Sequence, residues 1–274
     1  MGDCEISEAM LAAAEHGDIT RLQECFQPGM PVNEIAIHAA KHKQPRILEW
    51  CYSQGWEPPT ESLNDDFFNA VTDGGSIDVF QVLVDHGWNL NAHHTEACGD
   101  ALAIAIIFAE HDNYDLVKWL LEHGHRATPI DPYHGPSAIS WTIREETASM
   151  EMLKLLLDHG HELKDCGAGI MAADEGNLEA LKLLLDYGID IEDRNMLDYA
   201  FDDDQDEPYE SQGTALYRAC RQGQVECVEL LLDRGADASA RDDGGTSCIK
   251  IAIKRDHEDV VNLLRERGVS MAGI

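Results

Sequence analysis

Histidine is the residue type in this sequence with the most potential for chemistry, because neutral imidazole binds metals and the side chain titrates near neutral pH. Thirteen histidines are present. Three of them (His86, His123 and His159) stand one place before a recurring glycine, and HGH occurs at 123–125 and 159–161. Histidine in the last turn of a helix can also cap carbonyl groups and complement the helix dipole. We therefore favour capping, with a metal site or a pH-sensitive row of imidazoles as the alternatives.

Two other stretches have the form of ligand-binding motifs. GAGIMA at 167–172 fits the glycine pattern of a dinucleotide-binding turn, but that turn needs a preceding strand, and the residues before it are helix formers. DDDQDEPYE at 202–210 alternates aspartates as a calcium loop does, yet Glu207 and Gly213 stand where that loop needs glycine and glutamate. HExxH, GxSxG and P-loop motifs are absent from the sequence. These patterns predict a protein that is not an enzyme and has no catalytic residue, cofactor or metal ion.

The charge balance narrows the class of partner. Fifty-two acidic residues against 20 basic ones give a formal net charge of −32. A negative field repels phosphate backbones and anionic lipids, so we expect no nucleic-acid partner and no membrane binding, and the field favours a basic partner. The eight cysteines include no CxxC pair, and the first residues lack the pattern of a signal peptide. We therefore expect a reduced protein of the cytoplasm, or of the nucleus.

A recurring glycine organises the chain into repeats. LLLDHG at 155–160 returns as LLLDYG at 183–188 and LLLDRG at 230–235, and the series of glycines falls at positions 29, 55, 87, 124, 160, 188, 235 and 268. The intervals scatter around a period of about 33 residues, which is typical of a repeat architecture. In repeats such as 213–243, apolar residues at three- and four-residue steps lie on both sides of a second glycine, here Gly223. This pattern predicts two short helices per repeat, joined by a tight turn and ended by a left-handed glycine.

These residues resemble the ankyrin repeat. The stretch from Thr214 to Asp242 matches that family's pattern through TALYRA and LLLDRGADASARD, whereas the first six repeats replace its TPLH segment with sequences such as EIAIHA. The resemblance implies an all-α, ankyrin-type solenoid of helix-turn-helix repeats, with loop fingers and a curved concave face, forming a single domain over 1–274. The expected repeats are 5–33, 34–63, 64–97, 98–134, 135–165, 166–212, 213–243 and 244–274.

The resemblance also implies a function, namely recognition of a protein partner through the concave face and the loop edge. The alternatives from other classes are a small-molecule binder or enzyme that uses the groove, and an adaptor subunit that recruits a target to another complex. The pattern does not indicate an oligomeric state. Candidate contact residues follow the alanine pair of each first helix, and Trp141 is added as an aromatic candidate. The candidates are Lys41, His42, Ile107, Phe108, Trp141, Arg144, Glu145, Asp174, Glu175, Arg221, Gln222, Lys254 and Arg255.

Four apolar candidates have two readings each. Ile107 and Phe108 either present an apolar anchor on the groove or belong to the core of a displaced fourth repeat. Trp56 and Trp88 follow a terminal glycine where the family prefers alanine. We expect these two rings to wedge between neighbouring loops, with partner recognition as the alternative.

An acidic insertion interrupts the repeats between Gly188 and Gly235, which are 47 residues apart. Residues 190–212 contain ten acids and one arginine, so they contribute −9 to the net charge. Three roles are open: a solvated loop, a segment that shields the nearby bases Arg221, Lys254 and Arg255, or a binding element for a basic partner. The acidic loop residues are Asp202, Asp203, Asp204, Asp206, Glu207 and Glu210.

Overall fold

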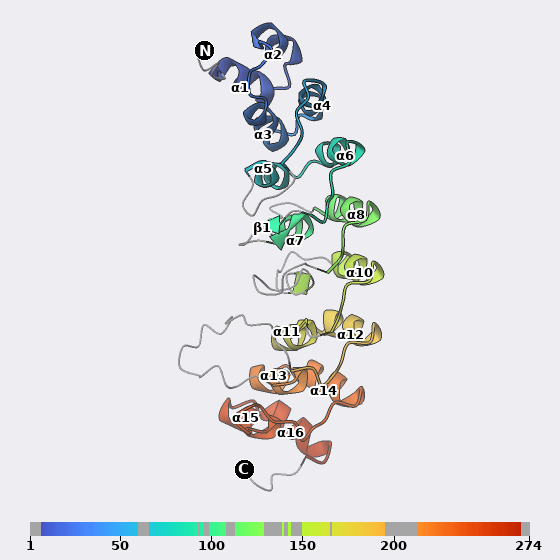
Figure 1. Ribbon diagram of the computed structural model, residues 1–274. Helices are drawn as coiled ribbons and strands as arrows, with labels where there is room; N and C mark the ends of the chain where they lie inside the picture. Colours follow the sequence, from blue (N-terminus) through green and yellow to red (C-terminus); the bar gives the residue numbers. More distant parts are fainter. Residues whose placement is uncertain are drawn as a thin grey trace. The chain divides into compact units, whose positions relative to one another are not determined.

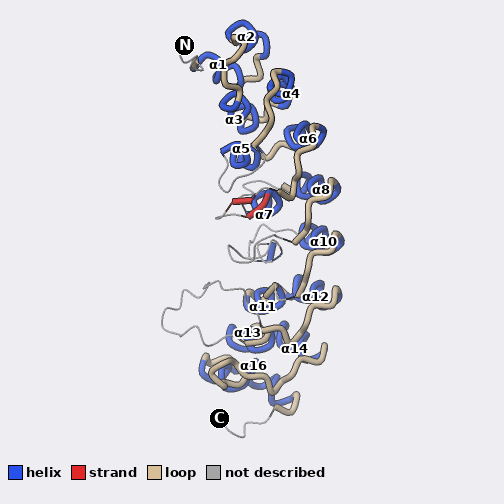
Figure 2. Tube along the Cα trace, in the orientation of Figure 1, coloured by secondary structure: helices blue, strands red, loops and turns tan. Residues whose placement is uncertain are grey.

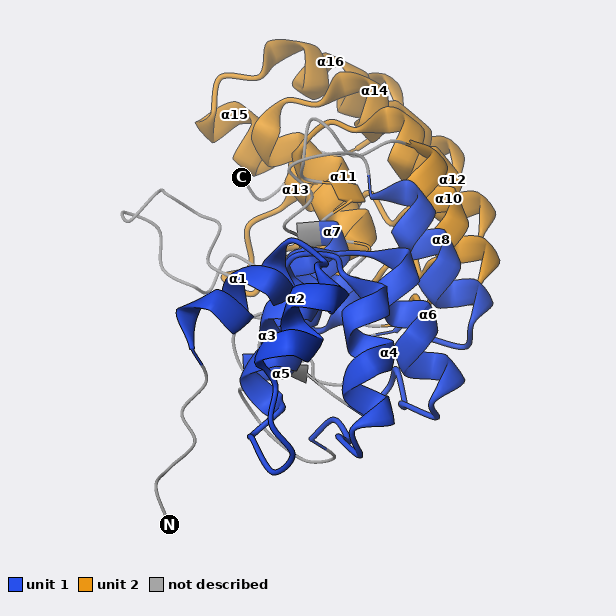
Figure 3. Ribbon diagram, turned by 90° about the horizontal axis from the view of Figure 1, so that it is seen from above, with its two compact units in different colours: residues 1–134 blue, residues 135–274 orange. Residues whose placement is uncertain are grey.

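Most of the chain is described by the computed structural model. The described residues are 7–59, 66–92, 94–95, 99–107, 113–128, 139, 142–143, 150–164, 166–194 and 213–269. Two compact units make up the chain, an N-terminal unit, Met1–His134, and a C-terminal unit, Gly135–Ile274 (Figure 3). The expected single domain stays a prediction.

The N-terminal unit is built of helix pairs, each a first helix and a second helix joined by a short turn (Figure 1). Its pairs are α1 (Glu8–Glu15) with α2 (Ile19–Cys25), α3 (Asn33–Lys41) with α4 (Pro45–Ser53), α5 (Asp66–Gly74) with α6 (Ile77–Asp85), and α7 (Ala101–Ile107) with α8 (Tyr114–Glu122). First helices contact first helices, α1 on α3 and α3 on α5, and the second helices α2, α4 and α6 form another row.

The C-terminal unit repeats this arrangement. Its helices are α10 (Met150–Asp158), α11 (Ala168–Asp174) with α12 (Leu178–Asp186), α13 (Ala215–Gln222) with α14 (Val225–Asp233), and α15 (Cys248–Lys254) with α16 (Glu258–Glu266). The first helices α11, α13 and α15 stack in order, as do the second helices α10, α12, α14 and α16. The predicted all-α architecture of helix-turn-helix repeats is therefore confirmed.

Short extended segments occur in the links between helix pairs. Strand β1 (His94–Thr95) pairs antiparallel with β2 (Gly99–Asp100), with His94 opposite Asp100 (Figure 2). An isolated antiparallel bridge joins Arg241 and Ser247 in the link between α14 and α15. Both links lie where the resemblance places loop fingers.

The glycine series that revealed the repeats has a backbone cause. All eight terminal glycines have φ between 80° and 95°, a left-handed conformation that a side chain disfavours. A Cβ atom at any of them would meet no atom within 4 Å, so backbone conformation, and not crowding, requires glycine here. The predicted left-handed end of each second helix is confirmed.

The residue after each terminal glycine is turned inward at six junctions. These residues are Trp56, Trp88, His125, His161, Ile189 and Ala236, and all are buried. The ring of Trp56 packs edge-on against Phe67 of the next repeat, with centroids 4.9 Å apart. The expectation that Trp56 and Trp88 wedge between repeats agrees with this burial.

Candidate functional site

Six of the described first helices, α1, α3, α5, α11, α13 and α15, lead into their turns through one left-handed residue, which we call the turn position. The residues at the turn position are Gly17, Lys43, Gly75, Gly176, Gly223 and Asp256, with φ between 58° and 76°. The turn position gives the repeats a common register, because side chains at the same distance from it occupy corresponding places in neighbouring first helices.

The side chain that follows the turn position reaches back to the preceding first helix at three junctions. The contacts are Gln44 Nε2 to the Glu15 carbonyl (3.0 Å), Gln224 Nε2 to the Asp174 carbonyl (3.2 Å) and His257 Nε2 to the Arg221 carbonyl (3.0 Å). Each accepting carbonyl lies in the last turn of a helix, where the helix itself supplies no donor. One hydrogen bond is thus repeated along the array, and we call its donor the coupling side chain.

The coupling side chain explains why glycine is needed at the two turn positions that a glutamine covers, Gly17 and Gly176. A Cβ atom at Gly176 would lie 2.4 Å from Oε1 of Gln224. Lys43 has the same left-handed backbone without being glycine, and the corresponding residue of the next repeat is Ser76. Serine is too short to cover the turn as glutamine does, so a Cβ atom is tolerated at Lys43.

Two histidines and a glutamate meet at the junction of α1 and α3, and we call them the His38 cluster. Nδ1 of His38 donates a 3.0 Å hydrogen bond to Oε1 of Glu15, and Nε2 of His42 lies 3.7 Å from that oxygen. The histidines are four residues apart, so they share one face of the helix, and their ring centroids are 6.3 Å apart. The side chains of His38 and Glu15 are each 33% exposed, and that of His42 is 43% exposed.

The corresponding positions at the junction of α11 and α13 hold what we call the Arg218 cluster. Nε of Arg218 donates a 2.6 Å hydrogen bond to Oδ1 of Asp174, and Nε2 of Gln222 donates to the same oxygen at 3.2 Å. Counted from the turn position, these residues occupy the places of the His38 cluster one for one. The Arg218 side chain is only 9% exposed and that of Asp174 18%, so this cluster is the more buried one.

A buried network fixes the finger between α14 and α15 to α13. The Tyr217 hydroxyl donates a 2.8 Å hydrogen bond to Oδ2 of Asp242, and the backbone N–H of Thr246 donates to Oδ1 of Asp242 at 2.5 Å. Burial, followed by the hydrogen bond to Asp242, raises the pKa of Tyr217 far above its usual range. The hydroxyl therefore stays protonated and acts as a structural donor.

Two of the three histidines before terminal glycines cap their own helices. Nδ1 of His123 and of His159 lies 2.8 Å and 2.9 Å from the carbonyl of the residue four places earlier. His86 differs, because its Nε2 lies 3.0 Å from Oε2 of Glu49 in the preceding repeat and its ring stacks on Tyr52 with centroids 3.7 Å apart. Capping is thus confirmed at two positions and replaced by a contact between repeats at the third.

The second histidine of each HGH sequence is buried. His125 is 4% exposed and His161 6%, and the Nε2 atom of each has no hydrogen-bond partner. Burial lowers the pKa of His161 to about 4, against the opposing effect of a hydrogen bond to the Glu162 carbonyl. His161 is therefore a packing residue of the core, whereas Nε2 of His125 lies 4.0 Å from Oδ1 of the buried Asp100. Among the residues that the structure describes, metal-ligand spacing is found at the His38 cluster and not at these pairs.

The candidate contact residues lie in different surroundings. Lys41, His42, Glu175, Gln222 and Lys254 are exposed, and Asp174 and Arg255 are half-buried. The expectation that Arg221 faces outward is wrong, because it is 3% exposed and its carbonyl is covered by His257 of the next repeat.

Other candidates lie wholly or partly outside the described residues. Ile107 ends α7. The described residues do not include the Ile107 side chain, nor Phe108, Trp141, Arg144, Glu145 and the acidic loop residues Asp202, Asp203, Asp204, Asp206, Glu207 and Glu210. A contact role stays a prediction for all of the candidates.

Sequence reasoning named His42 and Asp174 as contact residues and missed the clusters around them. The signal for the first was the spacing of His38 and His42, which are four residues apart in a predicted helix. Glu15 could be found only from the register of two repeats, because it lies 23 residues before His38.

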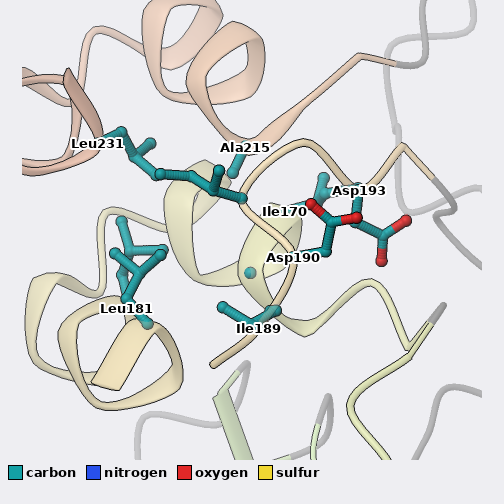
Figure 4. Close-up of a pocket in the computed structure, with 10 residues that line it drawn as sticks. Ile170, Leu181, Ile189, Asp190, Asp193, Ala215 and Leu231 are labelled. Atoms are coloured by element: carbon teal, nitrogen blue, oxygen red, sulfur yellow. The ribbon is translucent and has the colours of Figure 1, made fainter. Parts of the chain in front are cut away.

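A small apolar hollow lies between repeats in the C-terminal unit. Its lining includes Ile170, Leu181, Ile189 and Leu231, with Asp190 and Asp193 at one side (Figure 4). Its room is that of about one water molecule. A Cβ atom at Gly169, within GAGIMA, would lie 2.7 Å from Cδ1 of Ile189, so that glycine has a packing role.

Comparison with known proteins agrees with the repeat register. A family model described as ankyrin repeats (3 copies) matches residues 102–195 and 195–272, which together are more than half of the chain. A human protein described as ankyrin repeat and SOCS box protein 14 is 35% identical over 57 residues, a stretch that covers 20% of this chain and 9% of that protein. None of the helices that the structure describes is long and apolar enough to cross a bilayer.

Proposed function

The chain belongs to the ankyrin repeat family, and on that premise we propose that it binds a basic partner protein through the exposed sides of its first helices and its loop edge. Ankyrin repeats generally mediate protein–protein interactions. The finer elements of the proposal, which are the basic partner and the face that binds it, rest on the charge distribution.

The observation that carries the proposal is that bases in the C-terminal unit are engaged by acids of neighbouring repeats. Arg234 lies 2.7 Å from Asp186, Arg267 lies 2.6 Å from Asp233, and Arg194 lies 3.0 Å from Asp243. Because the chain has 52 acids and 20 bases, pairing of this kind leaves a large surplus of carboxylates facing solvent. Such a surface attracts a basic partner and raises its rate of association.

The first-helix face supports the choice of binding surface. Lys41 and Glu175 lie at corresponding ends of first helices and are exposed, whereas the coupling side chains beside them are used between repeats. Exposed side chains on helices that pack within either unit can contact a partner without a loss of packing energy. Localisation in the cytoplasm or nucleus belongs to the same proposal.

The alternatives have less support. The described hollow has room for about one water molecule, so it offers no site for a small substrate. An adaptor role would draw on the human protein named for its SOCS box, but the 57 matched residues cover 9% of that protein and support the repeats alone.

Affinity capture at two salt concentrations tests the proposal. We expect immobilised chain to retain basic proteins, identified by mass spectrometry, at low ionic strength and to release most of them at high ionic strength, because salt screens exposed charges. The variant Glu175→Lys, at the end of a first helix, should weaken retention of the partner, and the charge-matched variant Glu179→Lys, at an exposed position of the second helix α12, should keep it. Capture that is insensitive to salt would contradict the proposal that the partner is basic. Equal loss of the partner in both variants would contradict the proposal that the first-helix face binds it.

A further inference from the structure

We propose that Glu15, His38 and His42 bind one divalent transition-metal ion, such as Zn²⁺, across the junction of the first two repeats. The site differs from the proposed partner surface in its chemistry and does not depend on it. It uses one carboxylate from α1 and two imidazoles from α3, the same classes of ligand that bind zinc with an open position for water.

The spacing of the ligand atoms fits such an ion. Tetrahedral zinc with bonds of about 2.0–2.1 Å holds its ligand atoms about 3.4 Å apart. Nδ1 of His38 and Nε2 of His42 lie 3.0 Å and 3.7 Å from Oε1 of Glu15, on either side of that value. One ligand atom from each of the three residues lies within 4.8 Å of the others. Small side-chain rotations are therefore enough to close the site.

The backbone under the site is held in place before any ion binds. The Gln44 side-chain amide donates 3.0 Å hydrogen bonds to the backbone carbonyls of Glu15 and His42. One side chain therefore fixes the ends of both helices that carry these two ligands. His38 and His42 are four residues apart on one helix face, the arrangement in which two histidines chelate one ion. Partial exposure of all three side chains leaves a path for the ion and a place for water.

The ligand types favour a particular class of metal. Imidazole suits zinc, copper and nickel, whereas magnesium and calcium prefer sites made of oxygen atoms. Loose binding of ions to the many surface carboxylates is oxygen-only, so excess magnesium should compete with it and leave the His38 cluster available.

A similar contact between a histidine and a glutamate, that of His86 with Glu49, is not part of the proposed metal site. His86 also faces a glutamate of the preceding repeat, with Nε2 3.0 Å from Oε2 of Glu49. Its ring is stacked on Tyr52, and the groups with metal-ligand spacing among the described residues do not include it. His86 is therefore a matched control.

The test is competition for zinc between the chain and a chromophoric chelator, with tag-free full-length protein, reduced cysteines and excess magnesium. We expect the chain to take one zinc ion that His42→Ala weakens at least tenfold, since the substitution removes a ligand and leaves the hydrogen bond between His38 and Glu15. Glu15→Gln should weaken it as well. His16→Ala, at the corresponding position of the first repeat, and His86→Ala should bind as the unaltered chain does.

Thermal unfolding gives a second readout. Zinc should raise the Tm of the unaltered chain and of His86→Ala, and should raise that of His42→Ala much less, because an ion that binds only the folded form stabilises it. The proposal fails if the unaltered chain does not compete with the chelator. It also fails if His42→Ala and the two control variants bind zinc equally well.

Discussion

The His38 cluster and the Arg218 cluster are the same junction built with different chemistry. Each has an acid at the end of one first helix and two donors on the next, and each has a glutamine as the coupling side chain. The Arg218 cluster is largely buried and always charged, because arginine does not lose its proton in proteins. The His38 cluster is one-third exposed or more, and its two imidazoles are able to bind a metal.

This difference teaches that the repeat fixes positions and leaves the chemistry at those positions open. At both junctions the coupling side chain donates a hydrogen bond to the carbonyl of the acid residue itself, at the end of the preceding first helix. At the first donor position of the junction, the buried Arg218 forms an ion pair with the acid of the preceding helix. At the same position and the second donor position of the other junction, His38 and His42 are partly exposed and can act as metal ligands. A conserved geometry is therefore a guide to where function can arise, and the residue types decide whether it does.

The largest expected effect comes from removing the acid of each cluster in turn. Asp174→Ala removes the carboxylate that pairs with the buried Arg218, which should lower the free energy of unfolding by about 3 kcal/mol. Glu15→Ala removes an exposed contact and should cost about 1 kcal/mol or less. Urea unfolding followed by circular dichroism measures both. Four of the five tryptophans (50, 56, 88 and 119) lie in the N-terminal unit, so tryptophan emission tells the units apart. Equal costs would contradict the difference in burial.

Acid should destabilise the C-terminal unit through His161. The folded pKa of about 4 lies below the ordinary value of 6.5, so the unfolded chain takes up the proton first. The stability is present above pH 6.5 and is lost as the pH falls toward 4, by about 2 kcal/mol between pH 7 and pH 5. His161→Ile, which copies Ile189 at the corresponding position, should remove this contribution. If the variant lost stability between pH 7 and pH 5 as the unaltered chain does, His161 would not be the cause.

Glycine substitutions test what the two junctions share. A Cβ atom would lie 2.3 Å from Oε1 of Gln44 at Gly17 and 2.4 Å from Oε1 of Gln224 at Gly176. Gly17→Ala and Gly176→Ala should therefore each cost about 1–2 kcal/mol, from the left-handed backbone and the displaced glutamine. The measured quantity is the urea midpoint of each unit. If the two substitutions lowered the free energy of unfolding by amounts that differ by more than about 1 kcal/mol, the turn position and its coupling glutamine would not be equivalent at the two junctions.

The repeat architecture could be predicted from the sequence because the glycine after each second helix recurs along the chain. The left-handed conformation after these second helices favours glycine, and eight such glycines, at intervals scattered around about 33 residues, define the repeats before any contact is known. The clusters leave a weaker trace. Asp174 and Arg218 are 44 residues apart, and their contact depends on the length of the segment between them, which the acidic insertion alters.

The burial of Arg221 was also beyond the sequence pattern. Position within the first helix predicts an outward side chain, and Lys41 obeys that rule. At Arg221 the side chain is 3% exposed, and the backbone carbonyl accepts a hydrogen bond from His257 of the next repeat. Because Lys41 at the corresponding position is exposed, burial here depends on the surroundings of the junction and not on the helix position alone.

The last test exchanges the donor side chains of the His38 cluster and the Arg218 cluster and leaves the acids, the turn positions and the coupling side chains unchanged. Arg218→His with Gln222→His puts the imidazoles of the first junction beside Asp174, and His38→Arg with His42→Gln does the reverse beside Glu15. Competition with a zinc chelator should show one added ion for the first double variant and one lost ion for the second. The second should change stability by less than about 1 kcal/mol, because the new ion pair is exposed.

The control for this exchange is Arg218→His alone, which supplies one imidazole and should not gain a tight site. A gain in the single variant equal to that in the double variant would mean that the pair of histidines is not what binds. Loss of zinc at the first junction without a gain at the second would assign the difference to exposure, since the second junction is the more buried one. Gain at one junction together with loss at the other would show that residue type alone separates two junctions built on one frame.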